Sequence, residues 1–371
     1  MFIKSLALKD FRNYKEEIIE FNDSVNIVYG KNAQGKTNIL EALYLCATSK
    51  SHRTSNIKEL IRFEKDEAHI KVELYRESNL DNIDFHIKRN NKKYIAINKN
   101  PIKKLNELFG VMTIILFSPE DLGLIKNGPK ERRRFLDLEL CQINPLYYFY
   151  LKKYYHVLKQ RNTLLKKISK FKDNDDELEI WDMQLIEYGN HIIKIREEFI
   201  NALNPYFQEK HYKISKDTDT EIIYEKNTDA DNFNNKLKDR IKYDIMTGST
   251  SVGPHKDDLR FEINKTDIRK FGSQGQQRTA ALALKLSEIE FIRDSGAEMP
   301  ILLLDDVLSE LDEERQRHLI ESIKNIQTII TCTGIEDFIN FNQLRDSSII
   351  VNEKDIENNK LIQIDKGRWI R

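Results

Sequence analysis

The segment Gly30–Thr37, with the sequence GKNAQGKT, has the residue types and spacing that bind nucleotide phosphates. It matches the phosphate-binding pattern G-x-x-x-x-G-K-[ST] at every fixed position. In such a loop, backbone N–H groups and the positive end of the following helix favour an anion. We therefore expect Lys36 to contact the β- and γ-phosphates of ATP and the Thr37 hydroxyl to bind Mg²⁺. The predicted nucleotide-binding residues of this loop are Gly30, Lys31, Asn32, Ala33, Gln34, Gly35, Lys36 and Thr37.

The residues on either side of this loop favour a strand and a helix. Residues 25–29 (VNIVY) form a short, β-branched run that predicts a buried strand. Residues 38–45 have apolar side chains at helical spacing, with Leu40, Leu43 and Ala47 facing inward. This context disfavours the alternative, a chance match in a polar turn.

Such a site also needs an acidic element. Asp305 and Asp306 directly follow the apolar run 301–304 (ILLL), which predicts a buried strand. A carboxylate at that position, here Asp305, can hold Mg²⁺ through water. Its neighbour Asp306 can orient or deprotonate an attacking water. The alternative for this acidic pair is a turn after a buried strand. We predict that Lys36 and Asp306 are catalytic, and that Thr37 and Asp305 bind the metal.

Two further segments contain candidate phosphate ligands. Ser273, Gly275 and Gln276 open an apolar helix, and a second helix N-terminus with a free hydroxyl suits the γ-phosphate of a different nucleotide. Arg12 lies in a polar turn between two predicted strands. It could reach a nucleotide phosphate or be a solvated turn residue, and the sequence leaves both open.

The elements that must position these residues predict an α/β fold in three parts. Residues 1–125 contain the P-loop and an antiparallel β meander, which includes alternating runs at 68–75, 83–88 and 94–97. Residues 126–240 form an inserted helical lobe, and residues 241–371 return to nucleotide chemistry. The predicted helices of the lobe span 130–143, 145–172 and 181–203, with a turn at 172–177 and Pro205 just past the last helix.

The composition is that of a globular, highly charged chain. Of 371 residues, 40% are hydrophobic and 32% charged, with 60 Lys+Arg and 60 Asp+Glu, so an electrostatic nucleic-acid footprint would have to be local. The chain has no apolar run long enough to span a membrane and no signal-peptide core at its N-terminus. Cys46, Cys141 and Cys332 are too far apart in sequence to suggest a metal cluster or a disulfide framework. We expect a soluble, cytoplasmic protein without a membrane partner.

A local basic patch is predicted on the second helix of the lobe. Residues 152–172 contain several lysines and arginines and no acidic residue. Such a helix can follow a phosphate backbone, with an affinity that falls steeply with salt. The alternative is a solvated face over an aromatic core, and we expect the nearby tyrosines to belong to that core. The candidate DNA-binding residues are Lys152, Lys153, Lys159, Arg161, Lys166 and Lys167, and a second basic cluster comprises Lys126, Lys130 and Arg132–Arg134.

The order of these motifs resembles the ATP-binding-cassette heads of the SMC family and, within that group, the RecF family. The segments that carry the resemblance are 6–14, 30–37, 118–122, 132–137, 253–258 and 305–312. The resemblance implies an ABC-type, SMC-head-like ATPase lobe in which two copies of the chain hold ATP between them. By this resemblance, Ser273, Gly275 and Gln276 would contact the γ-phosphate bound at Lys36 of the other copy.

The resemblance implies roles for two further segments, and the sequence differs from the SMC-head pattern at two positions. Asp312 would help couple the two sites, and Thr331–Thr333 would occupy the switch position. Ser118–Glu120 stands where SMC heads carry a glutamine, and Asp306 stands where they use glutamate. The shorter acid favours slow turnover and a switch role over rapid hydrolysis.

The resemblance therefore implies an ATP-dependent DNA-binding protein of recombinational repair, replication and the SOS response. ATP would close a homodimer on double-stranded DNA or single-strand/double-strand junctions, and slow, DNA-stimulated hydrolysis would reopen it. RecR, and RecO through it, would be partners in loading the RecA recombinase. Alternatives are a transporter ATPase, for which no membrane-coupling segment is identified, and an SMC-like clamp, which needs a longer coiled coil. In a metabolic P-loop kinase, a further alternative, Ser273–Gln277 would have no role.

Overall fold

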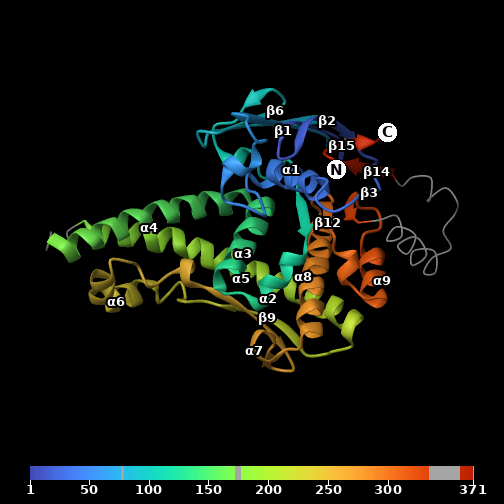
Figure 1. Cartoon of the computed structure of the whole chain (residues 1–371). Coiled ribbons are helices and arrows are strands. Elements are labelled where there is room, and N and C mark those ends of the chain that lie inside the picture. Colours follow the sequence, from blue (N-terminus) through green and yellow to red (C-terminus); the bar gives the residue numbers. More distant parts are fainter. Residues whose placement is uncertain (77–78, 172–176, 334–359, 371) are drawn as a thin grey trace. The chain divides into compact units, whose positions relative to one another are not determined.

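The computed structural model describes residues 1–76, 79–171, 177–333 and 360–370 (Figure 1). The chain divides into two compact units: unit 1 comprises Met1–Asp121 and Leu282–Arg371, and unit 2 comprises Leu122–Ala281. The three-part division expected from the motifs stays a prediction. In the compact units, residues 241–281 belong with the helical part.

Unit 1 contains an antiparallel sheet with the strand order β2-β1-β4-β5-β6-β7. Its strands are β1 (Phe2–Phe11), β2 (Tyr14–Glu20), β4 (Glu67–Arg76), β5 (Asn79–Lys88), β6 (Lys93–Ile97) and β7 (Asn100–Pro101). Leu6 lies opposite Val72 and Leu8 opposite Ile70, and all four side chains are buried. This alternation of buried and exposed residues is what a sheet with one covered face requires. The predicted antiparallel meander is confirmed.

A second sheet of unit 1 has the order β15-β14-β3-β13-β12-β8. Its strands are β3 (Val25–Tyr29), β8 (Ile114–Phe117), β12 (Ile301–Asp305), β13 (Thr328–Cys332), β14 (Lys360–Asp365) and β15 (Arg368–Ile370). All pairs are parallel except β14 with β15. The almost continuous apolar runs of β8, β12 and β13 are buried along their whole length, as in parallel sheets covered on both faces. Parallel strands end at one edge, so the residues after β3, β12 and β13 lie together.

Short helices complete unit 1. The α-helices are α1 (Lys36–Thr48) and α9 (Glu313–Ser322), and the 3₁₀ turns are η1 (Ile57–Leu60), η2 (Leu105–Glu107), η3 (Pro119–Asp121) and η5 (Leu308–Glu310). Helix α8 (Gln274–Asp294) begins in unit 2 and ends in unit 1. Leu40, Leu43 and Ala47 of α1 are buried, as their helical spacing predicts.

Unit 2 consists mainly of helices. They are α2 (Leu122–Lys126), α3 (Pro129–Ile143), α4 (Pro145–Phe171), α5 (Leu178–Ser215), α6 (Phe233–Thr247), α7 (Ile268–Phe271) and the 3₁₀ turn η4 (Pro254–Lys256). A small antiparallel sheet has the order β11-β10-β9, with strands β9 (Thr220–Glu225), β10 (Asp258–Ile263) and β11 (Thr266–Asp267). Helices α4 and α5 lie side by side over much of their length (Figure 1), and we call this pair the helical arm. The turn predicted at 172–177 lies almost entirely outside the described residues.

Helix α5 does not end before Pro205, as the sequence predicted, but continues through it to Ser215. The helix continues through Pro205 because the residues before and after the proline pack against other segments. The side chain of Asn204 exchanges two hydrogen bonds of 2.8 Å with the backbone of Ile222, and Phe207 is buried against Phe261. Packing therefore outweighs the cost of proline inside this helix.

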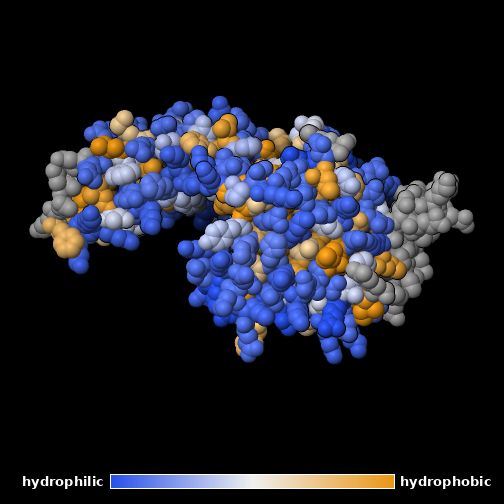
Figure 2. All heavy atoms as spheres, turned by 90° about the horizontal axis from the view of Figure 1, so that it is seen from above, coloured by the Kyte–Doolittle hydropathy of each residue, from blue (hydrophilic) through white to orange (hydrophobic). Residues whose placement is uncertain are grey.

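In the described ranges, no helix is long and apolar enough to cross a membrane. Hydrophilic side chains predominate on the face drawn in Figure 2, with apolar ones in small groups. The thiols of Cys46, Cys141 and Cys332 are buried and form no disulfide among the described residues.

Candidate nucleotide-binding site

The P-loop connects β3 to α1 and depends on glycine at two positions. Gly30 and Gly35 have φ angles of 153° and 117°, which L side chains rarely adopt. A Cβ on Gly30 would lie 2.3 Å from the carbonyl oxygen of Ile364, so the neighbouring strand also requires glycine. Gly35 precedes α1 and has no side chain that could cap its first turn. The N–H groups of that turn therefore suit an anion.

Lys36 is directed back onto the loop that precedes it. Its side chain is buried, and Nζ donates hydrogen bonds to the carbonyl oxygens of Gly30 and Lys31 over 2.7 and 3.2 Å. These carbonyls hold the ammonium group within the phosphate loop. A bound phosphate can replace them as a charged and therefore stronger acceptor.

The edge of the parallel sheet brings together Thr37 and Asp305, which the sequence assigned to one metal site. Thr37 Oγ1 donates to Asp305 Oδ1 over 2.9 Å, and Thr331 Oγ1 donates to the same oxygen over 2.8 Å. Burial raises the pKa of Asp305, the two hydroxyls partly offset this effect, and the charges of Asp306 and Glu120 add to it. The carboxylate is thus held in a position where added positive charge would stabilise it.

Asp306 combines an unusual backbone conformation with an unpaired side-chain atom. Its φ is 50°, in the left-handed region that is uncommon for residues other than glycine. Its backbone N–H donates to Thr331 Oγ1 over 2.9 Å. Its Oδ1 is buried and has no hydrogen-bond partner among the described residues. Such an atom can accept a hydrogen bond from a water or a ligand.

Thr331 is the residue whose role the sequence analysis missed. It was assigned only to a switch position, but its hydroxyl bonds to both acidic residues at the end of β12. The available signal was a hydroxyl residue near the end of a buried strand, here Thr331 in β13. Only the strand order, with β13 beside β12, shows which residues it reaches.

Arg12 is held by Glu41 of α1. Its Nε and Nη2 donate to the two carboxylate oxygens of Glu41 over 2.8 and 2.6 Å. Burial alone would raise the pKa of Glu41, but hydrogen bonds from Arg12 and Ser51 and the charges of Arg12 and Arg53 hold this pKa below its usual value. Arg12 is therefore a fixed residue beside the P-loop, and its contact with a nucleotide phosphate stays a prediction.

Ser273 and Gln276 form a reciprocal cap at the start of α8 in unit 2. The N–H of Gln276 donates to Ser273 Oγ over 3.2 Å, and the N–H of Ser273 donates to Gln276 Oε1 over 2.9 Å. This capping box fixes the helix end and leaves both side chains exposed. Asp312 similarly caps α9 by accepting a hydrogen bond from Arg315 N. The roles of these residues toward a second nucleotide stay predictions.

Comparison with known proteins identifies the family. Residues 2–355 match the family model described as RecF/RecN/SMC N terminal domain. A protein of Lachnoclostridium phytofermentans named DNA replication and repair protein RecF is 52% identical over 341 residues, which cover 92% of this chain and 95% of the relative. The chain belongs to the RecF family. A protein of the same name from Agathobacter rectalis is 53% identical over 340 residues, covering 91% of this chain and 94% of the relative.

Solved structures agree with this assignment. A RecF structure described as recombination mediator protein RecF-ATP in the RecFOR pathway has a TM-score of 0.89 and 35% identity, covering 100% of this chain and 97% of that chain. A RecF-ATPrS structure has a TM-score of 0.87 and 34% identity, covering 99% and 97%. An Smc head bound to a domain of ScpA shares the fold, with a TM-score of 0.54 and 16% identity over 100% and 96% of the two chains. The predicted SMC-head-like fold class is confirmed.

Helix α4 of this RecF-family chain presents most of its predicted DNA-binding residues to solvent. The helix contains no acidic residue. Helical spacing places Lys152, Lys159 and Lys166 on one stripe, with Lys167 beside it. The exposed lysines are Lys152, Lys153, Lys159, Lys166 and Lys167.

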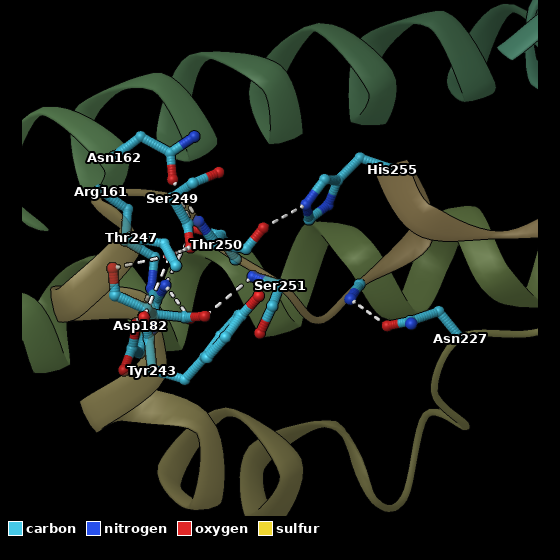
Figure 3. A network of polar contacts seen from close by, with 12 residues as sticks. Arg161, Asn162, Asp182, Asn227, Tyr243, Thr247, Ser249, Thr250, Ser251 and His255 are labelled. Atoms are coloured by element: carbon cyan, nitrogen blue, oxygen red, sulfur yellow. Dashed lines mark hydrogen bonds and ion pairs between the residues drawn. The ribbon is translucent and has the colours of Figure 1, made fainter.

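Arg161 was predicted to join these lysines, and the structure corrects this. Its side chain is fully buried, and helical spacing places it on the face of α4 opposite the lysine stripe. Figure 3 shows it beside Asp182. It donates to Asp182 over 2.5 Å, to Asp244 over 2.8 Å and to Thr250 over 2.9 Å. A guanidinium group in this position holds α4, α5 and α6 together and cannot reach a DNA phosphate. The sequence could not distinguish it, because its partners come from three other segments.

The second predicted basic cluster needs the same correction at Arg132. This residue is buried, and its Nε and Nη2 donate to Asp258 over 2.5 and 3.0 Å. Arg196 is likewise buried between Asp137 and Asp257, at 2.8 and 3.0 Å. We refer to Arg132, Arg161, Arg196 and their carboxylate partners as the arginine network.

Proposed function

We propose that this chain is an ATP-dependent DNA-binding protein that acts in DNA repair and replication, as the names of its relatives indicate for them. The observation that carries the proposal is the P-loop joined to Asp305 through Thr37 in a chain of the RecF family. The solved relatives with ATP support ATP as the nucleotide.

The residues at the sheet edge also fit Mg²⁺. Thr37 provides one oxygen ligand, and the adjacent carboxylate of Asp305 can hold the ion through water. Mg²⁺ usually takes one or two protein ligands together with substrate phosphates. Bound there, Mg²⁺ would neutralise charge on the phosphates.

The remaining side chains have distinct roles in this proposal. Lys36 would bind the β- and γ-phosphates, with the backbone of Gly30–Gly35 around them. The free Oδ1 of Asp306 would accept a proton or a hydrogen bond from the attacking water. Because Asp306 is a short acid in a fixed backbone conformation, we expect slow turnover that serves as a switch.

We further propose that ATP joins two copies of the chain. At the capped helix N-terminus, Ser273 and Gln276 are exposed and Gly275 is partly buried. This helix end is not needed by a P-loop that has its own donors. It would bind the γ-phosphate at Lys36 of the second copy. The mass of the protein in solution tests this by light scattering without nucleotide, with ADP and with ATP and Mg²⁺.

A monomer that becomes a dimer with ATP, and fails to do so as Ser273→Arg, supports the proposal. Asp306→Asn should prolong the dimer, since it would slow hydrolysis. A mass that does not change with ATP, at concentrations well above micromolar and with or without DNA, contradicts the shared site.

The exposed lysines of α4 are proposed to contact DNA phosphates. The triple variant Lys159→Gln, Lys166→Gln, Lys167→Gln should reduce the magnitude of the negative slope of log affinity against log salt by up to about 2.7, near 0.9 per lost phosphate contact. A matched triple variant of exposed lysines in unit 1, Lys15→Gln, Lys58→Gln and Lys103→Gln, should leave the slope unchanged. Equal slopes for all three proteins would place the DNA elsewhere.

The finer role is proposed from the family. RecR, and RecO through it, would be the partners, RecA loading would be the outcome, and single-strand/double-strand junctions would be the preferred DNA. A cytoplasmic location stays a prediction. ATP-dependent retention of RecR by the DNA-bound protein is the measurement that tests this part.

A further inference from the structure

The C-terminal hairpin of unit 1 lies against the P-loop. Strand β14 pairs in parallel with β3, the strand that leads into the loop, and places Gln363 opposite Tyr29. Strand β15 then returns along β14. The two residues of the turn, Lys366 and Gly367, have φ angles of 46° and 72°, as in a tight two-residue hairpin turn.

This turn makes two backbone hydrogen bonds to Gln34, within the P-loop. The N–H of Gly367 donates to the carbonyl oxygen of Gln34 over 3.0 Å, and the N–H of Lys366 donates to Gln34 Oε1 over 2.5 Å. Nδ2 of Asn13 donates to the same carbonyl oxygen over 2.7 Å. Segments near both ends of the chain thus hold one residue of the phosphate loop.

The three segments approach too closely to admit a methyl group. A Cβ on Gly367 would lie 2.8 Å from the backbone oxygen of Asn13. On the other side of the loop, Asn13 Oδ1 accepts a hydrogen bond of 2.8 Å from Asn38 in the first turn of α1. A change in the hairpin turn would therefore move Asn13, and with it the contacts to Gln34 and to the phosphate-binding helix.

We propose that Asn13 and the Lys366–Gly367 turn are positioning elements of the nucleotide site. They fix Gln34, so that the N–H groups of the P-loop point toward the phosphates before the nucleotide binds. A loop that is ordered in advance binds more tightly, because less conformational freedom is lost on binding. This inference rests on the proposed binding of ATP at the P-loop.

Gly367→Ala and Gly296→Ala form a matched pair that tests the inference. Gly296 has nearly the same φ, 73°, but an added Cβ there meets nothing within 4 Å. Both alanines strain the backbone equally, and only the first displaces Asn13. The dissociation constant for a fluorescent ATP analogue with Mg²⁺ should rise about five- to tenfold in Gly367→Ala, as expected for one or two lost hydrogen bonds, and stay unchanged in Gly296→Ala.

Asn13→Ala is the second variant, in case Gly367→Ala does not fold. Asn13 is exposed, so its loss should leave thermal stability nearly unchanged while ATP affinity falls by about fivefold. Parental affinity in Asn13→Ala or Gly367→Ala overturns the inference, as does equal weakening in Gly296→Ala. If the parent binds ATP no better than Lys36→Ala, the proposed function fails and the inference fails with it.

Discussion

Charged groups are arranged in opposite ways in the nucleotide site and in the arginine network. In the network, each buried guanidinium group is bound by at least one carboxylate, as Arg196 is by Asp137 and Asp257. Nη2 of Arg161 nevertheless has no hydrogen-bond partner among the described residues. In the nucleotide site, acids lie beside other acids. There, Asp305 has a raised pKa and Asp306 keeps a buried oxygen without a partner among the described residues.

The degree of pairing distinguishes charged groups that stabilise the fold from charged groups that are available to bind a ligand. Paired buried charges are costly to break, because the remaining partner stays buried and uncompensated. Incompletely paired acids reduce stability until a cation or donor binds, which is common at functional sites. His255 in unit 2 is a third case, a buried titratable group that loses its charge instead of pairing it. Burial lowers its pKa to about 4, so the neutral ring shares a hydrogen bond of 2.6 Å with Tyr154 OH.

The largest effect is expected when the network is broken at Arg161. Arg161→Met leaves Asp182 and Asp244 without their cation and should cost about 3–5 kcal/mol of unfolding free energy. Urea denaturation measures this. Lys167→Met, an exposed position on the same helix, is the control and should change stability by less than about 0.5 kcal/mol. A loss below about 1 kcal/mol for Arg161→Met would contradict the structural role of the network.

A charge of the nucleotide site should behave differently. Lys36→Ala should weaken ATP binding by about 2 kcal/mol, roughly thirtyfold, since it removes a charged hydrogen-bond donor to phosphate. The nucleotide-free protein should keep its thermal midpoint, because among the described residues Lys36 bonds only to carbonyls of its own loop. Titration with labelled ATP and a thermal scan give both values. Lys50→Ala, an exposed lysine after α1, should bind ATP normally.

Arg12 and Glu41 are a paired group inside the nucleotide region, so they sharpen the comparison. Arg12→Gln should cost about 1–2 kcal/mol at neutral pH, since it leaves the buried Glu41 with fewer donors. The pKa of Glu41 is held low in the folded protein, so its stabilising contribution is present at neutral pH and is lost as pH falls. The difference from the parent should therefore shrink below the ordinary carboxyl pKa of 4.5. Parallel acid titrations of stability for both proteins would show whether it does.

The smallest effect should have the opposite sign. Asp305→Asn should increase the unfolding free energy of the nucleotide-free protein by roughly 0.5–1 kcal/mol, because it removes a disfavoured buried charge. The thermal midpoint should rise accordingly. A raised carboxyl pKa means that the folded protein gains stability as pH falls and the acid is protonated. The advantage of Asp305→Asn should thus be greatest at neutral pH and smaller at acid pH. Destabilisation by Asp305→Asn at neutral pH would argue that Asp305 is a structural residue.

The sequence predicted the parts of the site that are local and patterned. The P-loop with its strand and helix, and the two acids after an apolar run, depend on residues close together in the chain. Thr37 and Asp305 were expected to lie close together, because both were predicted to bind one Mg²⁺; their direct hydrogen bond was not predicted. The alternating strands of the N-terminal sheet were found in the same way, from a period of two.

Contacts between distant segments could not be predicted. An arginine in an acid-free helix has the same local pattern whether it faces solvent, like the neighbouring lysines, or two buried carboxylates, like Arg161. The extension of α5 through Pro205 also depends on packing against β9 and β10, which the local helix signals do not include. The contact of the 366–367 turn with Gln34 depends on the parallel pairing of β14 with β3.

The order of the parallel sheet has a consequence for biosynthesis. Both neighbours of strand β3, β13 and β14, come from segments about 300 residues or more further along the chain. Translation at about 5–20 residues per second leaves β3 without these neighbours for tens of seconds. An apolar strand with two open edges is prone to pair with other chains. The emerging polypeptide would therefore depend on chaperones or on the antiparallel sheet, which is made before β13 and β14, to shield β3.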